Sequence, residues 1–352
     1  MNVNWIPSVP AVQDADTLLI SFETGFIQAM RATNAPTWPE QFGYSPGMIF
    51  PYLDVRFPVD FTTYGFKAWS GEHEFREEVS DYLDMTIGKF QEGARLDVEK
   101  LRDPRSAEII LWNQREAYIK DAWANFLAPE LYSTLSAGES TGTWRLTGGS
   151  NFFATNHNVN VKFPGSGGLG TFSNLLNNGG SKAATPVYAV LGGGAFSQLR
   201  PWAILRGEGM GPAIARVGGG GTVAPGAGEP WIVRWGTDSE YFKNTGKVKV
   251  SVVGEKGWSL FWPHAIIRQE GDLTYANLQQ LADAARGMKD LNGRVRASQT
   301  TIAALLCEPG DVSTINQLLG REVIANNATA ITGAQSSVDS MLRNVPVIPL
   351  DR

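Results

Sequence analysis

Two alternating runs of residues constrain this chain most, because each predicts a strand with one apolar face and no obvious partner. From Leu53 to Phe61 every second residue is apolar, and the residues between them are mostly charged. This spacing predicts a strand, and Pro58 places it at a sheet edge. A second alternating run spans residues 90–98. We expect the two runs to pair as a long two-stranded arm, which needs a partner surface because a lone ribbon is unstable in water.

A strongly charged segment lies between the two runs. It contains five charged side chains within seven residues, namely Glu72, Glu74, Arg76, Glu77 and Glu78. A charge run of this kind is usually a solvated face, and the same region holds many carboxylate pairs without any sign of a pocket. We predict that these residues form the tip of the arm and contact charged, mostly basic residues of a neighbouring subunit. Charges at an interface rim guide register and encounter more than they add affinity.

A long helix is expected after the arm. Asp103 followed by Pro104 predicts the start of a helix, with Asp as the N-cap and Pro at the first helical position. Pro129 divides or kinks this helix, and Gly138 ends it. Apolar residues recur along it at steps of roughly three and four, namely Ile109, Trp112, Ile119, Trp123 and Phe126. We predict that this stripe is the buried core face of the helix.

The first 49 residues are predicted to form an arm. Asp14 or Asp16 caps a helix that runs to about Thr33, with apolar residues at helical spacing. Prolines then interrupt the chain among aromatic residues, and we expect no regular structure there. The aromatic side chains still need a surface, which we expect on another part of the fold or on another subunit.

The remainder of the chain mixes short strands and helices. Strands are expected at residues 159–163, 187–191, 231–235, 247–253, 258–267, 302–306 and 345–350, and helices at 273–289 and 312–319. Glycines crowd the stretch from Gly138 to Gly221. Because the elements show no repeated strand–helix–strand order, the expected fold class is α+β.

Composition excludes several classes of protein. The chain is 43% hydrophobic and 18% charged, so it can bury real cores. Its formal net charge of -5 argues against a dedicated DNA-binding protein, which would normally be basic. No apolar run is long enough to span a membrane, and the N-terminus lacks a signal-peptide pattern. Cys307 is the sole cysteine, so neither an internal disulfide nor a multi-cysteine metal site is expected. We expect its thiol to be buried.

Motifs for chemistry occur in unconvincing contexts. Residues 165–170 match a dinucleotide-loop spacing, but the following segment is too short for the crossover helix. Ser140 lies in a Gly-x-Ser-x-Gly sequence, yet a helix precedes it where a hydrolase needs a strand. The histidines His73, His157 and His264 lack metal-ligand spacing. We therefore predict no catalytic, cofactor or metal site, and keep a hydrolase using Ser140, His157 or His264 as an alternative.

Five blocks, in order along the chain, resemble the major head subunits of Mu-like tailed phages. They are Tyr64 to Trp69-Ser70-Gly71 with Phe75-Arg76-Glu77; Gly88-Lys89-Phe90-Gln91-Glu92; Thr147-Gly148-Gly149-Ser150-Asn151-Phe152-Phe153 with His157; Ser173-Asn174-Leu175 with Pro186-Val187-Tyr188 and Leu199-Arg200-Pro201; and Leu273 to Leu278 with Met288 and Asn292-Gly293-Arg294. The sequence departs from this family at residues 99–103, which lack its run of consecutive acids, and at the loop 218–228, which has no counterpart.

The resemblance implies a Hong Kong 97-type capsid fold. The expected parts are an N-terminal arm at residues 1–49, an extended loop at 50–102, a peripheral domain with the spine helix at 103–164, an axial domain at 165–330 and a C-terminal return strand at 331–352. The arm and the extended loop would reach over neighbouring subunits, and axial domains would meet around five- and sixfold axes.

The same resemblance implies the major capsid protein of a tailed double-stranded DNA phage, located in the virion after assembly in the host cytoplasm. Its partners would be other copies of itself in hexamers and pentamers, with scaffold, portal and decoration proteins. Packaged DNA would be contacted without sequence preference, through inner-face residues such as Arg115 or Lys120. No cofactor and no membrane are expected. A nanocompartment shell with the same fold is an alternative.

Overall fold

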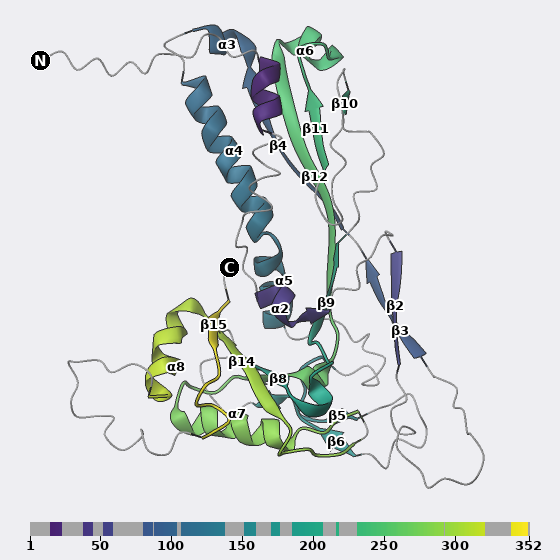
Figure 1. The fold of residues 1–352 in the computed structure, drawn as a ribbon, viewed down its shortest axis with the longest axis vertical. Helices are drawn as coiled ribbons and strands as arrows, with labels where there is room; N and C mark the ends of the chain where they lie inside the picture. The colour runs from purple at the N-terminus through teal and green to yellow at the C-terminus, as the bar shows by residue number, and fades with distance from the viewer. Residues whose placement is uncertain are drawn as a thin grey trace, which may run out of the picture.

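The computed structural model describes residues 15–22, 38–44, 52–58, 80–86, 88–103, 107–137, 151–159, 170–176, 185–206, 216–217, 231–291, 293–320 and 339–350 of the chain. These residues form two regions, an upper region built on a long sheet beside helix α4 and a lower region built on a second sheet (Figure 1). Helices and strands are mixed along the chain without a repeated strand–helix–strand order. This arrangement agrees with the α+β class expected from the sequence.

The upper sheet is organised around one long strand. It contains β1 (Gly43–Tyr44), β4 (Gly88–Asp97), β9 (Trp202–Arg206), β10 (Arg216–Val217), β11 (Trp231–Trp235) and β12 (Lys247–Leu260). β12 is antiparallel to β4 along one edge and to β11 and β9 along the other. Residues that pair across the sheet share a face, so the partners Leu96 and Val248 both point to the side that is buried.

Two helical segments cover the buried face of the upper sheet. They are α4 (Glu108–Asn125) and helical residues 15–22, drawn in purple beside β12 in Figure 1. The rings of Phe22 and Trp112 lie 5.7 Å apart between their centroids, in one apolar cluster with Leu96 and Val250 of the sheet. Asp16 lies within the helix at residues 15–22. Its carboxylate accepts hydrogen bonds from the backbone N–H and the hydroxyl of Thr237. This contact fixes the helix to the loop before α6 (Glu240–Thr245).

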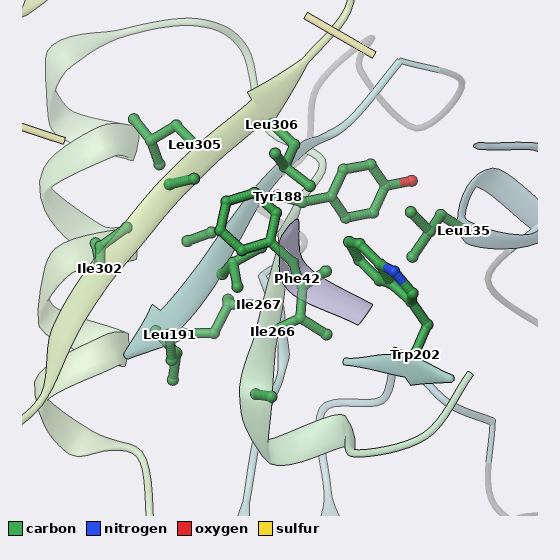
Figure 2. Close-up of a cluster of buried hydrophobic side chains, with 14 of the residues drawn as sticks. Phe42, Leu135, Tyr188, Leu191, Trp202, Ile266, Ile267, Ile302, Leu305 and Leu306 are labelled. Carbon is green, nitrogen blue, oxygen red and sulfur yellow. The ribbon is translucent and has the colours of Figure 1, made fainter. Parts of the chain in front are cut away.

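The lower sheet is buried on both faces. Its order is β15 (Val347–Pro349), β14 (Thr301–Cys307), β8 (Val187–Gly192), β13 (Ile266–Gln269) and β7 (Leu175–Leu176). Helices α7 (Tyr275–Gly287) and α8 (Val312–Leu318) pack on this sheet, and Figure 2 shows Leu135 and Trp202 approaching Tyr188 from the other side. All four residues of β13 are buried, as is typical of a strand covered on both faces.

Aromatic residues of the predicted arm pack within the same chain. Trp38 lies in α2 (Trp38–Phe42), and its ring meets that of Trp202 edge-on, with 5.5 Å between the centroids. The indole N–H of Trp202 donates to the carbonyl of Pro39 at 2.6 Å. The expectation that proline excludes regular structure here was wrong, because Pro39 occupies the first turn, where a helix needs no N–H donor.

The predicted two-stranded arm has a different second strand. β2 (Tyr52–Pro58) is antiparallel to β3 (Ser80–Thr86), and both strands lie in a separate two-stranded sheet. The predicted pairing of residues 53–61 with residues 90–98 was therefore wrong. Residues 88–97 instead form a ten-residue ladder with β12, which buries the apolar face of β4 against α4.

The boundaries of the long helix also differ from the prediction. α4 begins at Glu108 because residues 98–102 form a separate short helix, α3 (Val98–Arg102), whose N-cap is Asp97. Asp103 is the C-cap of α3 and not the N-cap of the long helix. The long helix divides at Phe126, and Pro129 lies in the first turn of α5 (Leu127–Ala137). The ring is tolerated there because the first N–H groups of a helix have no partner within it.

One further strand prediction needs correction. Residues 247–260 form one continuous strand, so residues 258–267 do not form a strand of their own; a short turn of 3₁₀ helix, η5 (Pro263–Ala265), separates β12 from β13. Of the strand expected at 159–163, Val159 alone lies within the described residues; the short strand β5 (His157–Asn158) precedes it and pairs with β6 (Thr171–Phe172). The remaining elements are η4 (Gly194–Phe196) and η6 (Pro309–Asp311).

Candidate assembly surfaces

The β2–β3 hairpin carries two carboxylates at directly opposed positions. Asp54 pairs with Asp84 in the register of the two strands. Like charges at opposed positions on one face destabilise a strand pair. Among the described strands, β2 and β3 pair with each other and with no third strand. In Figure 1 the hairpin lies on the far side of the upper sheet from α4. The predicted tip residues Glu72, Glu74, Arg76, Glu77 and Glu78 lie outside the described residues.

Helix α4 carries apolar residues on two opposite faces. Trp112 and Ile119 are 1% and 2% exposed and point into the upper core. Ile110 and Tyr118 are 62% and 66% exposed, and Leu111 accompanies them on the outer face. A helix with one buried face normally has a polar outer face. The outer face of α4 therefore has the character of an interaction surface.

The lower end of the predicted helical stripe packs in an aromatic cluster. The ring of Phe126 lies 4.4 Å from that of Phe90 on β4 and 6.0 Å from that of Trp258 on β12, measured between centroids. The indole N–H of Trp258 donates to the hydroxyl of Thr134 at 3.0 Å, which ties the cluster to α5. The side chains of the other two stripe residues, Ile109 and Trp123, lie outside the described part of the structure.

Strand β4 has an open edge that faces α4. Among the described strands it pairs with β12 alone, so one row of its backbone groups points away from the sheet. Side chains of α4 reach this row: Glu108 accepts from the N–H of Asp97 at 3.3 Å, and Arg115 donates to the carbonyl of Arg95 at 2.7 Å. A charged edge of this kind resists unwanted strand pairing.

A cleft of about 410 Å³ lies between this edge and α4. Its charged lining comprises Arg95, Lys100, Arg115 and Lys247 with Glu92, Asp97 and Glu108. Two ion pairs use part of this charge, between Arg115 and Glu108 at 3.4 Å and between Lys247 and Asp97 at 4.0 Å. Within the described residues, the side chains of Arg95 and Lys100 form no ion pair. The cleft therefore contains two cations, Arg95 and Lys100, that have no ion-pair partner among the described residues.

Residues of two of the sequence blocks, around His157 and Asn174, form a buried hydrogen-bond network in the lower region. The Asn174 amide donates to the carbonyls of Phe152 at 2.8 Å and Pro263 at 3.1 Å. Its oxygen accepts from the N–H of Ala154 at 2.9 Å and lies 3.0 Å from Nε2 of His157. One side chain thus joins three segments that are distant in the sequence. Buried polar groups satisfied in this way specify a unique packing.

Two histidines flank one aromatic ring in the same place. The ring of Phe172 stacks on His157 with 5.0 Å between the centroids, and on His264 with 4.1 Å. Burial lowers the pKa of His157, while hydrogen bonds to Asn174 and the Phe152 carbonyl oppose that shift. Burial, with a smaller effect of His157, lowers the pKa of His264 to about 3. Both rings are therefore neutral at pH 7.

The two histidines of the alternative hydrolase site lie away from the surface. His157 and His264 are fully buried, and Ser140 lies outside the described residues. Of residues 165–170, Gly170 alone is described, and Cys307 is buried in β14. The described residues contain no group of three or more His, Cys, Asp or Glu side chains placed to hold a metal ion. No helix in the described part of the chain is long and apolar enough to cross a membrane.

Sequence reasoning missed two features of these surfaces. The outer apolar residues Ile110, Leu111 and Tyr118 were visible as a second helical stripe, offset from the first, which would have marked α4 as a helix with two contact faces. Arg95 and Lys100, which have no ion pair within the described part of the chain, had no such signal. Their proximity to α4 depends on the pairing of β4 with β12, which the sequence pattern does not specify.

No family model matches the sequence, and no curated protein matches it significantly. The fold, in contrast, is similar to that of solved capsid chains. A chain from the procapsid of bacteriophage JBD30 is 16% identical, with a TM-score of 0.61 over 94% of this chain and 97% of that chain. A chain from the JBD30 capsid is 14% identical, with a TM-score of 0.55 over 90% of each chain. A third, from the JBD30 capsid decorated with minor capsid protein trimers, gives 14% identity and a TM-score of 0.53, covering 84% of this chain and 86% of that chain. The chain thus has the fold of these phage capsid chains.

Proposed function

We propose that this chain is the major capsid protein of a tailed double-stranded DNA phage of the Mu-like type. Its copies would form the hexamers and pentamers of an icosahedral head that encloses the genome. The observation that carries this proposal is the fold similarity to the JBD30 procapsid chain, which extends over nearly the full length of both chains. Five sequence blocks in the same order as in Mu-like head subunits support it independently. The role is structural and requires no catalytic centre.

We infer that the parts of the subunit follow the Hong Kong 97 plan. Residues 1–49 would be the N-terminal arm, 50–102 the extended loop, 103–164 the peripheral domain, 165–330 the axial domain and 331–352 the return strand. The separate β2–β3 hairpin supports the assignment of the extended loop, and the long helix α4 supports that of the spine helix. Because β4 belongs to the upper sheet, the free part of the loop would end before Gly88. Scaffold, portal and decoration proteins would be further partners.

Packaged DNA would be contained and not read. The net charge of -5 supports this, because tight DNA binding depends on basic side chains that neutralise phosphates. Arg115 already contacts the Arg95 carbonyl and Glu108, and the side chain of Lys120 lies outside the described residues. A filter-binding assay should find weak, salt-sensitive binding without sequence preference. Tight and selective binding at physiological salt would contradict this part of the proposal.

Electron microscopy of the full-length protein, expressed with and without a scaffold protein, tests the main proposal. Closed shells of uniform size are the expected result. A protein that stays monomeric in light scattering at high concentration, with the scaffold present, would contradict it. Shells that enclose a protein cargo and never package DNA during infection would instead identify a nanocompartment.

A further inference from the structure

We propose that the outer face of α4 packs against the same face of α4 in a second copy, with the two helices antiparallel about a twofold axis at Gln114. The apolar side chains of this face are Ile110, Leu111 and Tyr118, and Gln114 is exposed among them. The inference rests on the proposed function, and it specifies one contact that would join two subunits of a shell.

The outer face of α4 holds a cluster of exposed apolar side chains. In the described part of the chain six large hydrophobic side chains are exposed, and three of them are Ile110, Leu111 and Tyr118. Tyr118 lies about two helical turns after the other two, so the three share one side of the helix. Figure 1 shows α4 at the margin of the upper region, with the upper sheet on its other side. Exposed apolar groups that cluster in this way mark a contact surface.

The positions of these side chains are symmetric about Gln114. Ile110 and Tyr118 each lie four residues, about one helical turn, from Gln114. In an antiparallel pair of helices centred there, Ile110 of one copy lies opposite Tyr118 of the other. Leu111 lies opposite Ala117, which is exposed and small, so the larger side chain has room to pack. One register thus covers all three apolar side chains of both copies, as a contact between identical surfaces requires.

Charge favours the antiparallel orientation. Asp121 is exposed seven residues after Gln114, and Ala107, the N-cap of α4, lies seven residues before it. The antiparallel pair therefore places each Asp121 carboxylate beside the first turn of the other helix. That turn carries outward N–H groups and a partial positive charge, and Ala107 supplies no side-chain acceptor for them. Its acidic residue, Glu108, is buried and paired with Arg115. A parallel pair would instead bring the two Asp121 carboxylates together.

A twofold contact suits the junction between rings of subunits. A contact between identical surfaces joins two copies and then closes, so it does not extend a ring. Hexamers and pentamers in a shell need a further contact that joins subunits of neighbouring rings. Three apolar side chains from each copy make an interface that is small beside the roughly 1,200 Å² or more of a stable complex. The α4 pair would therefore form in the shell, where many such contacts act together, and not between free subunits.

Disulfide formation across the axis tests the contact directly. Gln114→Cys places a thiol on the axis, where the Cα atoms of facing residues lie within the roughly 7 Å that a disulfide allows. Shells of this full-length variant, oxidised and run on a non-reducing gel, should consist mostly of covalent dimers. The natural thiol of Cys307 is buried. Asn113→Cys is the matched control, because this exposed position is turned about 100° away on the same helix and should give about tenfold less dimer.

The products distinguish the possible occupants of this face. Shells of Gln114→Cys that stay monomeric on the gel would overturn the inference and leave the proposed function intact. A covalent product with a scaffold or any other protein would overturn it as well, because the face would then have a different partner. Absence of shells from the unaltered protein would instead count against the proposed function.

Reversal of the Asp121 charge provides a second test that does not depend on a disulfide. Asp121→Lys would place a cation beside the first turn of the partner helix at both ends of the contact, so the yield of shells should fall about fivefold or more. Asp121→Glu keeps the charge and should assemble like the unaltered protein. Unfolding curves of both soluble variants should match that of the unaltered subunit, because Asp121 is exposed. Equal shell yields from the two variants would contradict the proposal.

Discussion

The two regions of this subunit differ in how completely they bury themselves. In the lower region β8 and β13 are covered on both faces by residues of the same chain, and Asn174 satisfies four buried polar groups. In the upper region β4 pairs with β12 alone among the described strands, and α4 exposes Ile110 and Tyr118. A chain that assembles can leave such surfaces to its neighbours. From this comparison we expect substitutions in the buried lower region to act on subunit stability, and substitutions on the exposed face of α4 to act on assembly.

A substitution on the buried face of α4 should cause the largest loss of stability. Trp112→Ala removes a ring that is 1% exposed and packs on Phe22, so it should lower the free energy of unfolding by about 3–5 kcal/mol. That loss is a large share of the roughly 5–15 kcal/mol that stabilises a domain. Denaturant unfolding of the soluble subunit measures it. A melting temperature equal to that of the unaltered protein would show that the upper region does not depend on this core.

Breaking the polar network around Asn174 in the lower region should cause the second largest loss of stability. Asn174→Leu leaves the N–H of Ala154 and the carbonyls of Phe152 and Pro263 without their partner. Leaving a buried polar group unpaired costs about 1–3 kcal/mol, so unfolding should become easier by at least that amount. The exposed neighbour Asn158 provides the control, and Asn158→Leu should change little. Equal effects of both changes would mean that the network is not what maintains the lower region.

Acid should destabilise the lower region through its buried histidines. The pKa of His264 falls from an ordinary value of 6.5 to about 3 on folding, so the unfolded chain binds the proton first as the pH drops. Stability is therefore fully present above pH 6.5 and decreases below it, by about 2 kcal/mol between pH 6.5 and pH 5 from this residue. His157 changes stability in the same direction.

Unfolding curves measured at several pH values check this expectation. His264→Phe should remove part of the decrease between pH 6.5 and pH 5, and the slope that remains would include the contribution of His157. A variant whose stability falls with pH as steeply as that of the unaltered protein would contradict the assignment. It would also show that acid acts mainly on the upper region.

The outer face of α4 should give the smallest effect on stability. Tyr118→Ala removes a side chain that is 66% exposed, so the free energy of unfolding should change by no more than about 0.5 kcal/mol. The same change should reduce shell assembly, because we expect this face to contact another copy. Measuring both quantities in one variant separates the roles of the two faces of α4. A loss of stability as large as that of Trp112→Ala would remove the distinction between them.

Local sequence patterns determined most of the individual elements. The strands expected at residues 231–235, 187–191 and 302–306 appear as β11, β8 and β14, and helices α7 and α8 lie within two residues of the predicted ends. These patterns are local, because a strand repeats every two residues and a helix every 3.6. The order of five short sequence blocks also indicated the class of protein, which the fold similarity to JBD30 capsid chains supports.

Only the tertiary structure decided which strands pair and which faces remain open. Residues 53–61 and 90–98 alternate equally well, so sequence spacing could not show that the first pairs with Ser80–Thr86 and the second with β12. Nor could spacing show that two opposite stripes of α4 differ, one buried and one exposed. Pairing and burial depend on contacts between residues far apart in the chain, such as Asp97 with Lys247. For that reason most of the longer elements could be predicted from the sequence, whereas the pairing of β4 and the edge that it leaves open depend on the fold.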